Sequence, residues 1–191
     1  LASMLLSCGG GKGEVQKEGG LPVFDISKEY PEKTIDLQEI AEVEYIPLET
    51  TEKSVAMIHA NPHISEKYII NCDLGGPVHF YDRQGKHLYA LHANGQGPQE
   101  YYGIVAFTVD FPKEEFYIYD LRKLQVYSFA GEWKRTLKVP EGMRYENLFN
   151  YDEHHLICEN AFHDWWNFEN LPTDKTPYYL INKETGTLTP L

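Results

Sequence analysis

The chain repeats one short unit three times, and this repetition limits its possible folds more than any other feature. Each unit ends in a hairpin with a glycine in its turn, and these glycines are Gly85, Gly131 and Gly186. Within each unit, short apolar and aromatic segments are separated by turn signals, and no segment keeps a helical period. Four short antiparallel strands that recur about every 40–50 residues are typical of β-propeller blades.

We therefore predict an all-β chain with about three four-stranded antiparallel blades of a β-propeller. The blades are expected at roughly residues 54–92, 104–138 and 145–191, and the first strand of the first blade at 55–59. Aromatic residues make up 14% of the chain, which favours strands over helices. A β-sandwich is the rival fold, but it gives no reason for three similar copies.

The segment before the blades is predicted to hold little regular structure. Short extended pieces are expected at residues 34–37 and 43–48, and a single helical turn at 37–42. Pro47 is expected to mark a strand edge or end, because proline cannot donate to a sheet ladder.

A glycine-rich segment, Gly95–Tyr101, joins the first two units. A phosphate-binding loop is excluded, because its glycines would have to lead into a helix and a strand follows instead. We expect a crossing between blades in which Gly95 and Gly97 supply the backbone angles. Glu100 is expected to bind backbone N–H groups or Arg122.

The first residues resemble a targeting signal. An apolar run ends in Leu5-Leu6-Ser7-Cys8, which resembles the bacterial lipobox, where a cysteine after a small residue becomes lipidated. Residues 1–20 are then a signal-peptide remnant, lipobox and flexible tether, and residues 21–191 the partial propeller. The resemblance implies a membrane anchor at Cys8. Gly9 after the cysteine implies anchoring in the outer membrane. The alternative to the lipobox interpretation is an ordinary disordered end with a chance cysteine.

Three motifs resemble the six-bladed, NHL-like β-propeller lipoproteins of Bacteroides-type bacteria. They are Tyr45–Thr50, Phe80–Lys86 and Gly95–Tyr101, in the order and spacing of that family. A six-bladed ring needs roughly 270 residues, so the resemblance implies the N-terminal half of such a ring. The segment 43–48 would complete the last blade, leaving an exposed edge here.

Charge and cysteine usage limit the partners. The net charge of −12 excludes nucleic acid, which requires a basic surface. No cysteine or histidine spacing predicts a zinc site, so no metal or other cofactor is expected. Cys72 and Cys158 are expected to be buried free thiols, with a disulfide between them as the alternative.

Loops at one end of the blades form the candidate ligand face. Its long insertion at 159–177 could stack aromatic rings on sugars, or the rings could fold back over the blades. Asp73 and Asp120 occupy equivalent positions in two repeats, where a carboxylate would either stabilise the turn or bind a cation. The candidate residues are Asp73, Glu100, Tyr101, Asp120, Arg122, Arg144, His163, Asp164, Trp165 and Trp166.

These features favour a lipid-anchored envelope module that binds or scaffolds a glycan, peptide or protein. No motif for a catalytic nucleophile or phosphate loop occurs. The alternative is a propeller enzyme, such as a lyase or lactonase-like hydrolase, with Asp, His and Glu facing the channel. A structural partner within a surface nutrient-uptake assembly is a third hypothesis.

Overall fold

The computed structural model describes residues 17–18, 21–22, 25–52, 62–73, 76–160 and 176–191. The chain divides into two compact units, Leu1–Glu44 and Tyr45–Leu191. The first unit contains the antiparallel pair β1 (Lys17–Glu18) and β2 (Leu21–Pro22) and the 3-10 helix η1 (Leu37–Glu39). The single helical turn expected there is confirmed. No helix in the described parts of the chain has the length and apolar character needed to cross a membrane.

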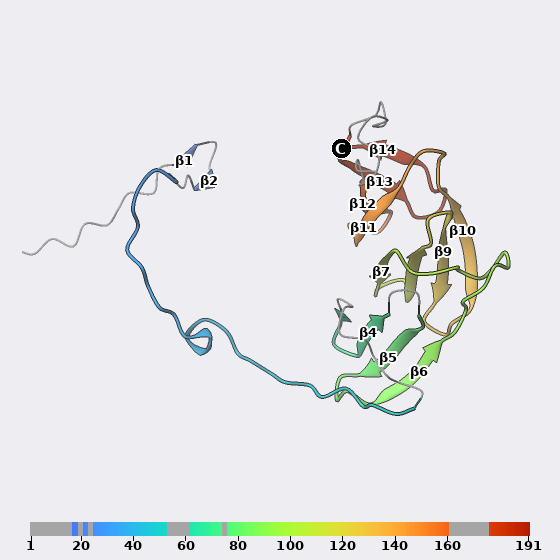
Figure 1. Ribbon diagram of the computed structural model, residues 1–191, viewed down its shortest axis with the longest axis horizontal. Coiled ribbons are helices and arrows are strands. Elements are labelled where there is room, and N and C mark those ends of the chain that lie inside the picture. The colour runs from blue at the N-terminus through green and yellow to red at the C-terminus, as the bar shows by residue number, and fades with distance from the viewer. Residues whose placement is uncertain (1–16, 19–20, 23–24, 53–61, 74–75, 161–175) are drawn as a thin grey trace, which may run out of the picture. The chain divides into compact units, whose positions relative to one another are not determined.

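The second unit consists of three four-stranded antiparallel sheets, which follow one another along the chain (Figure 1). Blade 1 contains β3 (His63–Ile64), β4 (Tyr68–Cys72), β5 (Val78–Asp82) and β6 (His87–Leu91). Blade 2 contains β7 (Ala106–Asp110), β8 (Glu115–Tyr119), β9 (Lys123–Ser128) and β10 (Trp133–Lys138). Blade 3 contains β11 (Tyr145–Asn150), β12 (His155–Asn160), β13 (Tyr178–Asn182) and β14 (Leu188–Pro190). The predicted fold class is confirmed.

Each blade pairs its strands in chain order, so the hairpin turns set the register. Gly85, Gly131 and Gly186 all have positive φ values, between 74° and 82°. Glycine reaches this left-handed region without the steric cost of a Cβ atom. The repeated glycines therefore mark equivalent turns, as the sequence indicated.

The two faces of blade 2 belong to two different cores. On β8, Phe116 and Ile118 pack toward blade 1, whereas Tyr117 and Tyr119 pack toward blade 3. All five residues of β8 are buried, which explains its continuous run of aromatic and aliphatic residues. Strand β7 also lies beside β11 of blade 3. No blade encloses a core alone, so the three sheets depend on one another.

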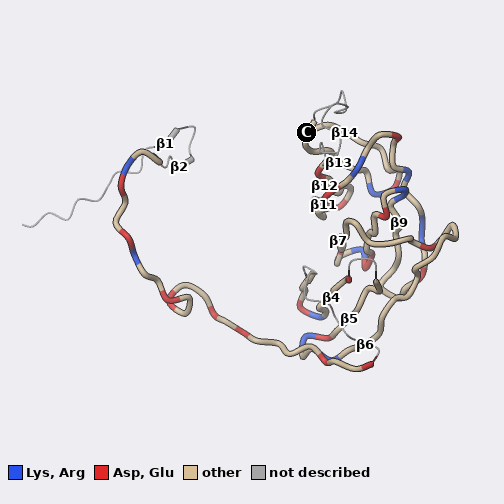
Figure 2. The backbone as a smooth tube through the Cα atoms, in the orientation of Figure 1, with Lys and Arg blue, Asp and Glu red and all other residues tan. Residues whose placement is uncertain are grey.

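Charged side chains join blades 2 and 3 as well. Figure 2 shows acidic and basic positions interspersed over the blades. Lys183 is fully buried, and its Nζ donates to Asp110 Oδ2 at 2.5 Å and to the carbonyl of Asp152. A buried ammonium requires such partners, because desolvation would otherwise penalise its charge.

The extended pieces predicted at 34–37 and 43–48 are not paired as strands, since the described residues 25–52 contain no strand. The backbone after Pro47 instead contacts the first hairpin turn, where the Glu49 N–H donates to the Gly85 carbonyl at 2.7 Å. A Cβ atom on Gly85 would lie only 2.1 Å from the Pro47 oxygen. The strand expected at 55–59 lies outside the described residues.

Cys72 and Cys158 are buried free thiols, as expected, and form no disulfide. Burial raises the pKa of each thiol to about 12. Both cysteines therefore act as small apolar side chains.

Candidate functional site

The crossing at Gly95–Tyr101 is held by side chains of β9. Gln125 Nε2 donates to the carbonyls of Pro98 and Glu100 at 2.9 and 3.0 Å, and the Tyr127 hydroxyl donates to the Gln99 carbonyl at 2.6 Å. These bonds satisfy backbone carbonyls that leave the sheet between blades. The crossing is therefore a structural element, consistent with the sequence-based interpretation.

A left-handed backbone does not explain the glycines of the crossing. Neither Gly95 nor Gly97 has a positive φ value. A Cβ atom on Gly95 would lie 1.9 Å from Glu100 Oε2, and one on Gly97 would lie 3.0 Å away. The Gly97 N–H donates to the same oxygen at 2.8 Å. Glycine leaves room for the Glu100 carboxylate, which occupies the space that a side chain on Gly95 would fill.

Asp120 stabilises its own loop. It accepts hydrogen bonds from the N–H groups of Tyr102, Arg122 and Lys123 and from the Arg122 guanidinium. Burial raises the pKa of Asp120, but these donors outweigh it and hold the pKa below the ordinary value. Its carboxylate is therefore committed to the turn, which was one of its two predicted roles.

The remaining described candidates differ in their exposure. Tyr101 is fully buried, and its hydroxyl donates to the Gly76 carbonyl at 3.2 Å. Asp73 is also buried, whereas Arg122 and Arg144 are exposed. The Arg122 guanidinium lies 5.4 Å from the ring centre of Tyr102. Cys8, His163, Asp164, Trp165 and Trp166 lie outside the described residues.

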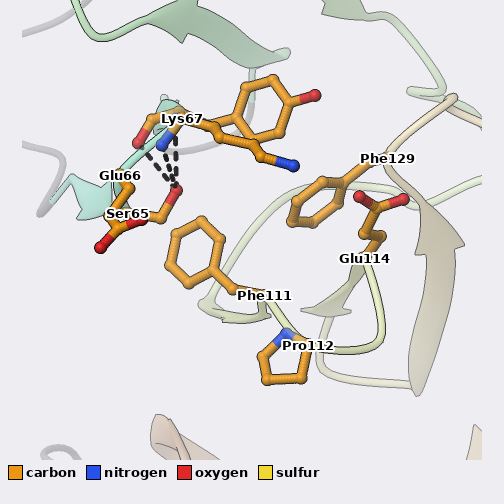
Figure 3. Close-up of a pocket in the computed structure, with 8 residues that line it drawn as sticks. Ser65, Glu66, Lys67, Phe111, Pro112, Glu114 and Phe129 are labelled. Atoms are coloured by element: carbon orange, nitrogen blue, oxygen red, sulfur yellow. Dashed lines mark hydrogen bonds between the residues drawn. The ribbon is translucent and has the colours of Figure 1, made fainter.

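A pocket of about 300 Å³ opens at the other end of the strands, between blades 1 and 2 (Figure 3). It is formed where the β3–β4 turn faces the β7–β8 turn, beside the end of β9. We call it the interblade pocket. Its lining residues are Ser65, Glu66, Lys67, Tyr68, Phe111, Pro112, Glu114 and Phe129.

Three aromatic rings form the walls of the interblade pocket. Phe129 stands nearly perpendicular to Tyr68 and to Phe111, at 89° and 85°, with ring centres 5.7 and 6.0 Å apart. Edge-to-face contacts of this kind fix the ring orientations. All three rings are only partly buried, so part of this aromatic surface faces solvent.

Polar and charged groups surround these rings. In Figure 3 the Lys67 side chain extends toward Phe129 and Glu114. The Ser65 hydroxyl accepts from the N–H groups of Lys67 and Tyr68 and thereby holds the turn. Lys67 and Glu114 are exposed and can bind ligand hydroxyls beside an aromatic wall.

Glu114 has a strained backbone. Its φ of +50° is positive, as is that of one other non-glycine residue in the described chain, Leu121 at +72°. A side chain in this region costs roughly 1 kcal/mol relative to glycine. The Phe129 N–H donates to the Glu114 carbonyl at 2.8 Å, which holds this conformation. Such strain concentrates at functional sites.

Sequence reasoning did not find the interblade pocket. Its residues come from turns that are 46 residues apart, and none forms a recognisable motif. The repeats do contain one signal for such a pocket, because equivalent turns of adjacent blades lie at the same end of the strands. Phe111 and Phe129 then become candidates, because they are large apolar residues in two turns of one blade.

Comparison with protein families matches residues 21–189 to a domain of unknown function, DUF4934. Comparison with curated proteins finds no match. Among solved structures, the chain is similar to a presumed exported protein of Bacteroides fragilis, with a TM-score of 0.63 and 13% identity. The similarity covers 82% of this chain and 43% of that protein, so the chain spans less than half the length of the structure it matches. At this identity the likeness shows the fold alone.

Proposed function

We propose that this chain, which belongs to the DUF4934 family, is a binding module of the cell envelope that holds a glycan in the interblade pocket. One observation carries the proposal: partly exposed aromatic rings and charged side chains line the same open pocket. Sugars present C–H groups on one face and hydroxyls around the edge, so they need both kinds of surface.

The size of the pocket favours a short ligand. Small-molecule sites in proteins range from about 300 to 1,000 Å³, and this pocket lies at the lower limit at about 300 Å³. One sugar unit fits such a volume better than an oligosaccharide does. Phe111 and Phe129 would contact its ring, while Lys67 and Glu114 would bind its hydroxyls.

The envelope location rests on two separate observations. Leu5-Leu6-Ser7-Cys8 resembles a lipobox, and the structurally similar Bacteroides fragilis protein is described as exported. We propose that acyl chains on Cys8 anchor the module to the outer membrane through the tether. The family resemblance suggests that the blades are part of a six-bladed ring.

Calorimetry or a glycan array with the whole chain tests the binding site. Lys67→Ala should weaken glycan binding about tenfold or more, because a charged hydrogen bond contributes about 1.5–3 kcal/mol. Arg144→Ala, at the other end of the blades, is the control and should bind normally. Loss of binding in Trp165→Ala or Trp166→Ala, with Lys67→Ala unaffected, would place the ligand on the loop face and reject the interblade pocket.

Fractionation of a Bacteroides-type host tests the anchor. Cys8→Ala should move the protein from the membrane fraction to the soluble fraction and abolish labelling by a fatty-acid analogue. Ser3→Ala, earlier in the same segment, should change neither result. Unchanged labelling of Cys8→Ala would exclude this cysteine as the lipidated residue.

A further inference from the structure

A second cavity, of about 630 Å³, lies on blade 1. His79 on β5 lines it and lies on the strand face opposite to Val78 and Phe80, which pack toward blade 2. We call this cavity the histidine groove. Its lining residues are Thr51, Glu52, Asp73, Pro77, His79, His87, Leu88, Tyr89, Ala90 and His92.

His79, which lines this groove, has an unsatisfied ring nitrogen. The residue is 2% exposed, and its Nδ1 lies 3.5 Å from His87 Nε2. Its Nε2 has no hydrogen-bond partner among the described residues and lies 3.6 Å from Asp73 Oδ2. A buried polar atom without a partner costs about 1–3 kcal/mol. A ligand in the groove would remove this cost.

The fold does not require this unsatisfied atom. Gln125 stands 46 residues after His79, at the equivalent position of blade 2. Its side-chain amide is fully used: it donates to two carbonyls of the crossing and accepts from Trp133 and Thr136. At this strand position, the side chain of Gln125 in blade 2 has all its hydrogen-bond partners. The side chain of His79 in blade 1 lacks one.

The charges of the groove indicate the kind of ligand. Asp73 and Glu52 contribute carboxylates, and the described lining residues include no Lys or Arg. Burial lowers the pKa of His79, and this outweighs the opposing effect of Asp73. In the tautomer whose Nδ1–H donates to His87, a neutral His79 imidazole offers a lone pair at Nε2. These groups repel anions and accept hydrogen bonds.

A metal ion explains the groove less well. No three His, Cys, Asp or Glu side chains in the described part of the chain converge as metal ligands. The volume of about 630 Å³ also falls within the range of organic ligands. Pro77, Leu88, Ala90 and Tyr89 offer apolar surface for a carbon body.

We propose that the histidine groove binds a small organic amine. Its ammonium donates to Nε2 of His79 and to Oδ2 of Asp73, which are 3.6 Å apart and within reach of a single ammonium. Its carbon chain lies along the apolar residues, and Glu52 adds a second negative charge. This site is independent of the glycan site.

Three five-carbon probes test the amine directly by calorimetry on the whole chain. Cadaverine carries ammonium groups, 1,5-pentanediol carries hydroxyls and glutarate carries carboxylates. Cadaverine should bind at least tenfold more tightly than the diol, and glutarate should not bind. Equal binding of cadaverine and the diol, or no binding of cadaverine, would overturn the proposal.

Two substitutions locate the amine. Asp73→Asn and His79→Gln should each weaken cadaverine binding at least tenfold, and His79→Gln copies the residue that blade 2 tolerates at this position. Circular dichroism checks that both variants fold. Glu114→Gln, in the interblade pocket, should bind cadaverine normally. If Glu114→Gln loses cadaverine while Asp73→Asn keeps it, the amine belongs to the interblade pocket and the proposal fails.

Discussion

Glu114 combines backbone strain with a place beside an open pocket, and these two properties can be separated by mutation. Asparagine tolerates positive φ better than glutamate does and is too short to reach far into the pocket. Glu114→Asn should therefore raise the free energy of unfolding by up to about 1 kcal/mol and weaken glycan binding. Urea unfolding and calorimetry on the same sample measure both effects.

Leu121 provides the matched control, because it has the other positive φ among the described non-glycine residues. Leu121→Asn should stabilise the fold to a similar extent and leave glycan binding unchanged, since Leu121 lies outside the pocket. If Glu114→Asn stabilises the chain without affecting binding, the strain at Glu114 has no connection with the ligand.

The Glu100 carboxylate fills the space beside Gly95. Gly95→Ala should lower the free energy of unfolding by about 1 kcal/mol, because its Cβ would displace the Glu100 carboxylate, which accepts from the Gly97 N–H. Gly97→Ala, with 3.0 Å to the same oxygen, should cost less. The double substitution Gly95→Ala with Glu100→Ala should recover most of the loss in urea unfolding. Without such recovery, Gly95 would be required for its backbone conformation after all.

At the level of strands, an ion-pair cluster connects β8, β10 and blade 3. Arg135 donates to both oxygens of Glu115 at 3.0 and 2.9 Å and also to the Lys183 carbonyl. Lys134 adds a second cation at 3.0 Å from Glu115. Burial raises the pKa of Glu115, but these partners outweigh it and lower the pKa to about 2. The charged form of Glu115 is therefore strongly favoured in the folded chain.

This lowered pKa predicts acid sensitivity. The folded pKa of about 2 is below the ordinary value of 4.5, so the stabilisation is fully present above about pH 4.5 and is lost as the pH falls toward 2. The loss is at most about 3 kcal/mol. Glu115→Gln should show a smaller drop in unfolding free energy between pH 6 and pH 3. Glu114→Gln is the control and should keep the full drop; an equal drop in Glu115→Gln would contradict the assignment.

The strands were predictable from sequence where local pattern alone decides them. β8 (115–119) lies within the second predicted blade, 104–138, because its run of aromatic and β-branched residues and its flanking turns are local signals. The segment 43–48 is not paired as a strand, and the residue after it, Glu49, binds the Gly85 turn, 36 residues away. Alternating apolar residues predict an extended chain, but they do not reveal whether a strand edge is available to pair with it.

The candidate sites were less predictable for the same reason. The turn residues Ser65, Phe111 and Phe129 become one pocket only when blades 1 and 2 stand side by side. His79 belongs to no recognisable motif, and its role becomes apparent only by comparison with Gln125 in the next blade. Both sites arise from the relation between repeats, which a single motif does not encode.

In the folded unit as a whole, stability is divided between two interfaces. One core lies between blades 1 and 2 and includes Ile70, and the other lies between blades 2 and 3 and includes Leu156; both residues are fully buried. Repeated units of this kind are stabilised chiefly by contacts with their nearest neighbours. Blade 2 contributes to both cores, whereas blades 1 and 3 each contribute to one.

A symmetric pair of substitutions tests this division. Ile70→Ala and Leu156→Ala should each cost about 2–5 kcal/mol, because each leaves a cavity in a packed core. Ile70→Ala should accelerate amide hydrogen exchange in β5 far more than in β13, and Leu156→Ala should do the reverse, since each weakens one interface only. Equal acceleration in both strands by either variant would show that the three blades open as one cooperative unit. Blade 2 is then the informative reference: its β8 amides should be the slowest to exchange in both variants, because one intact interface always remains.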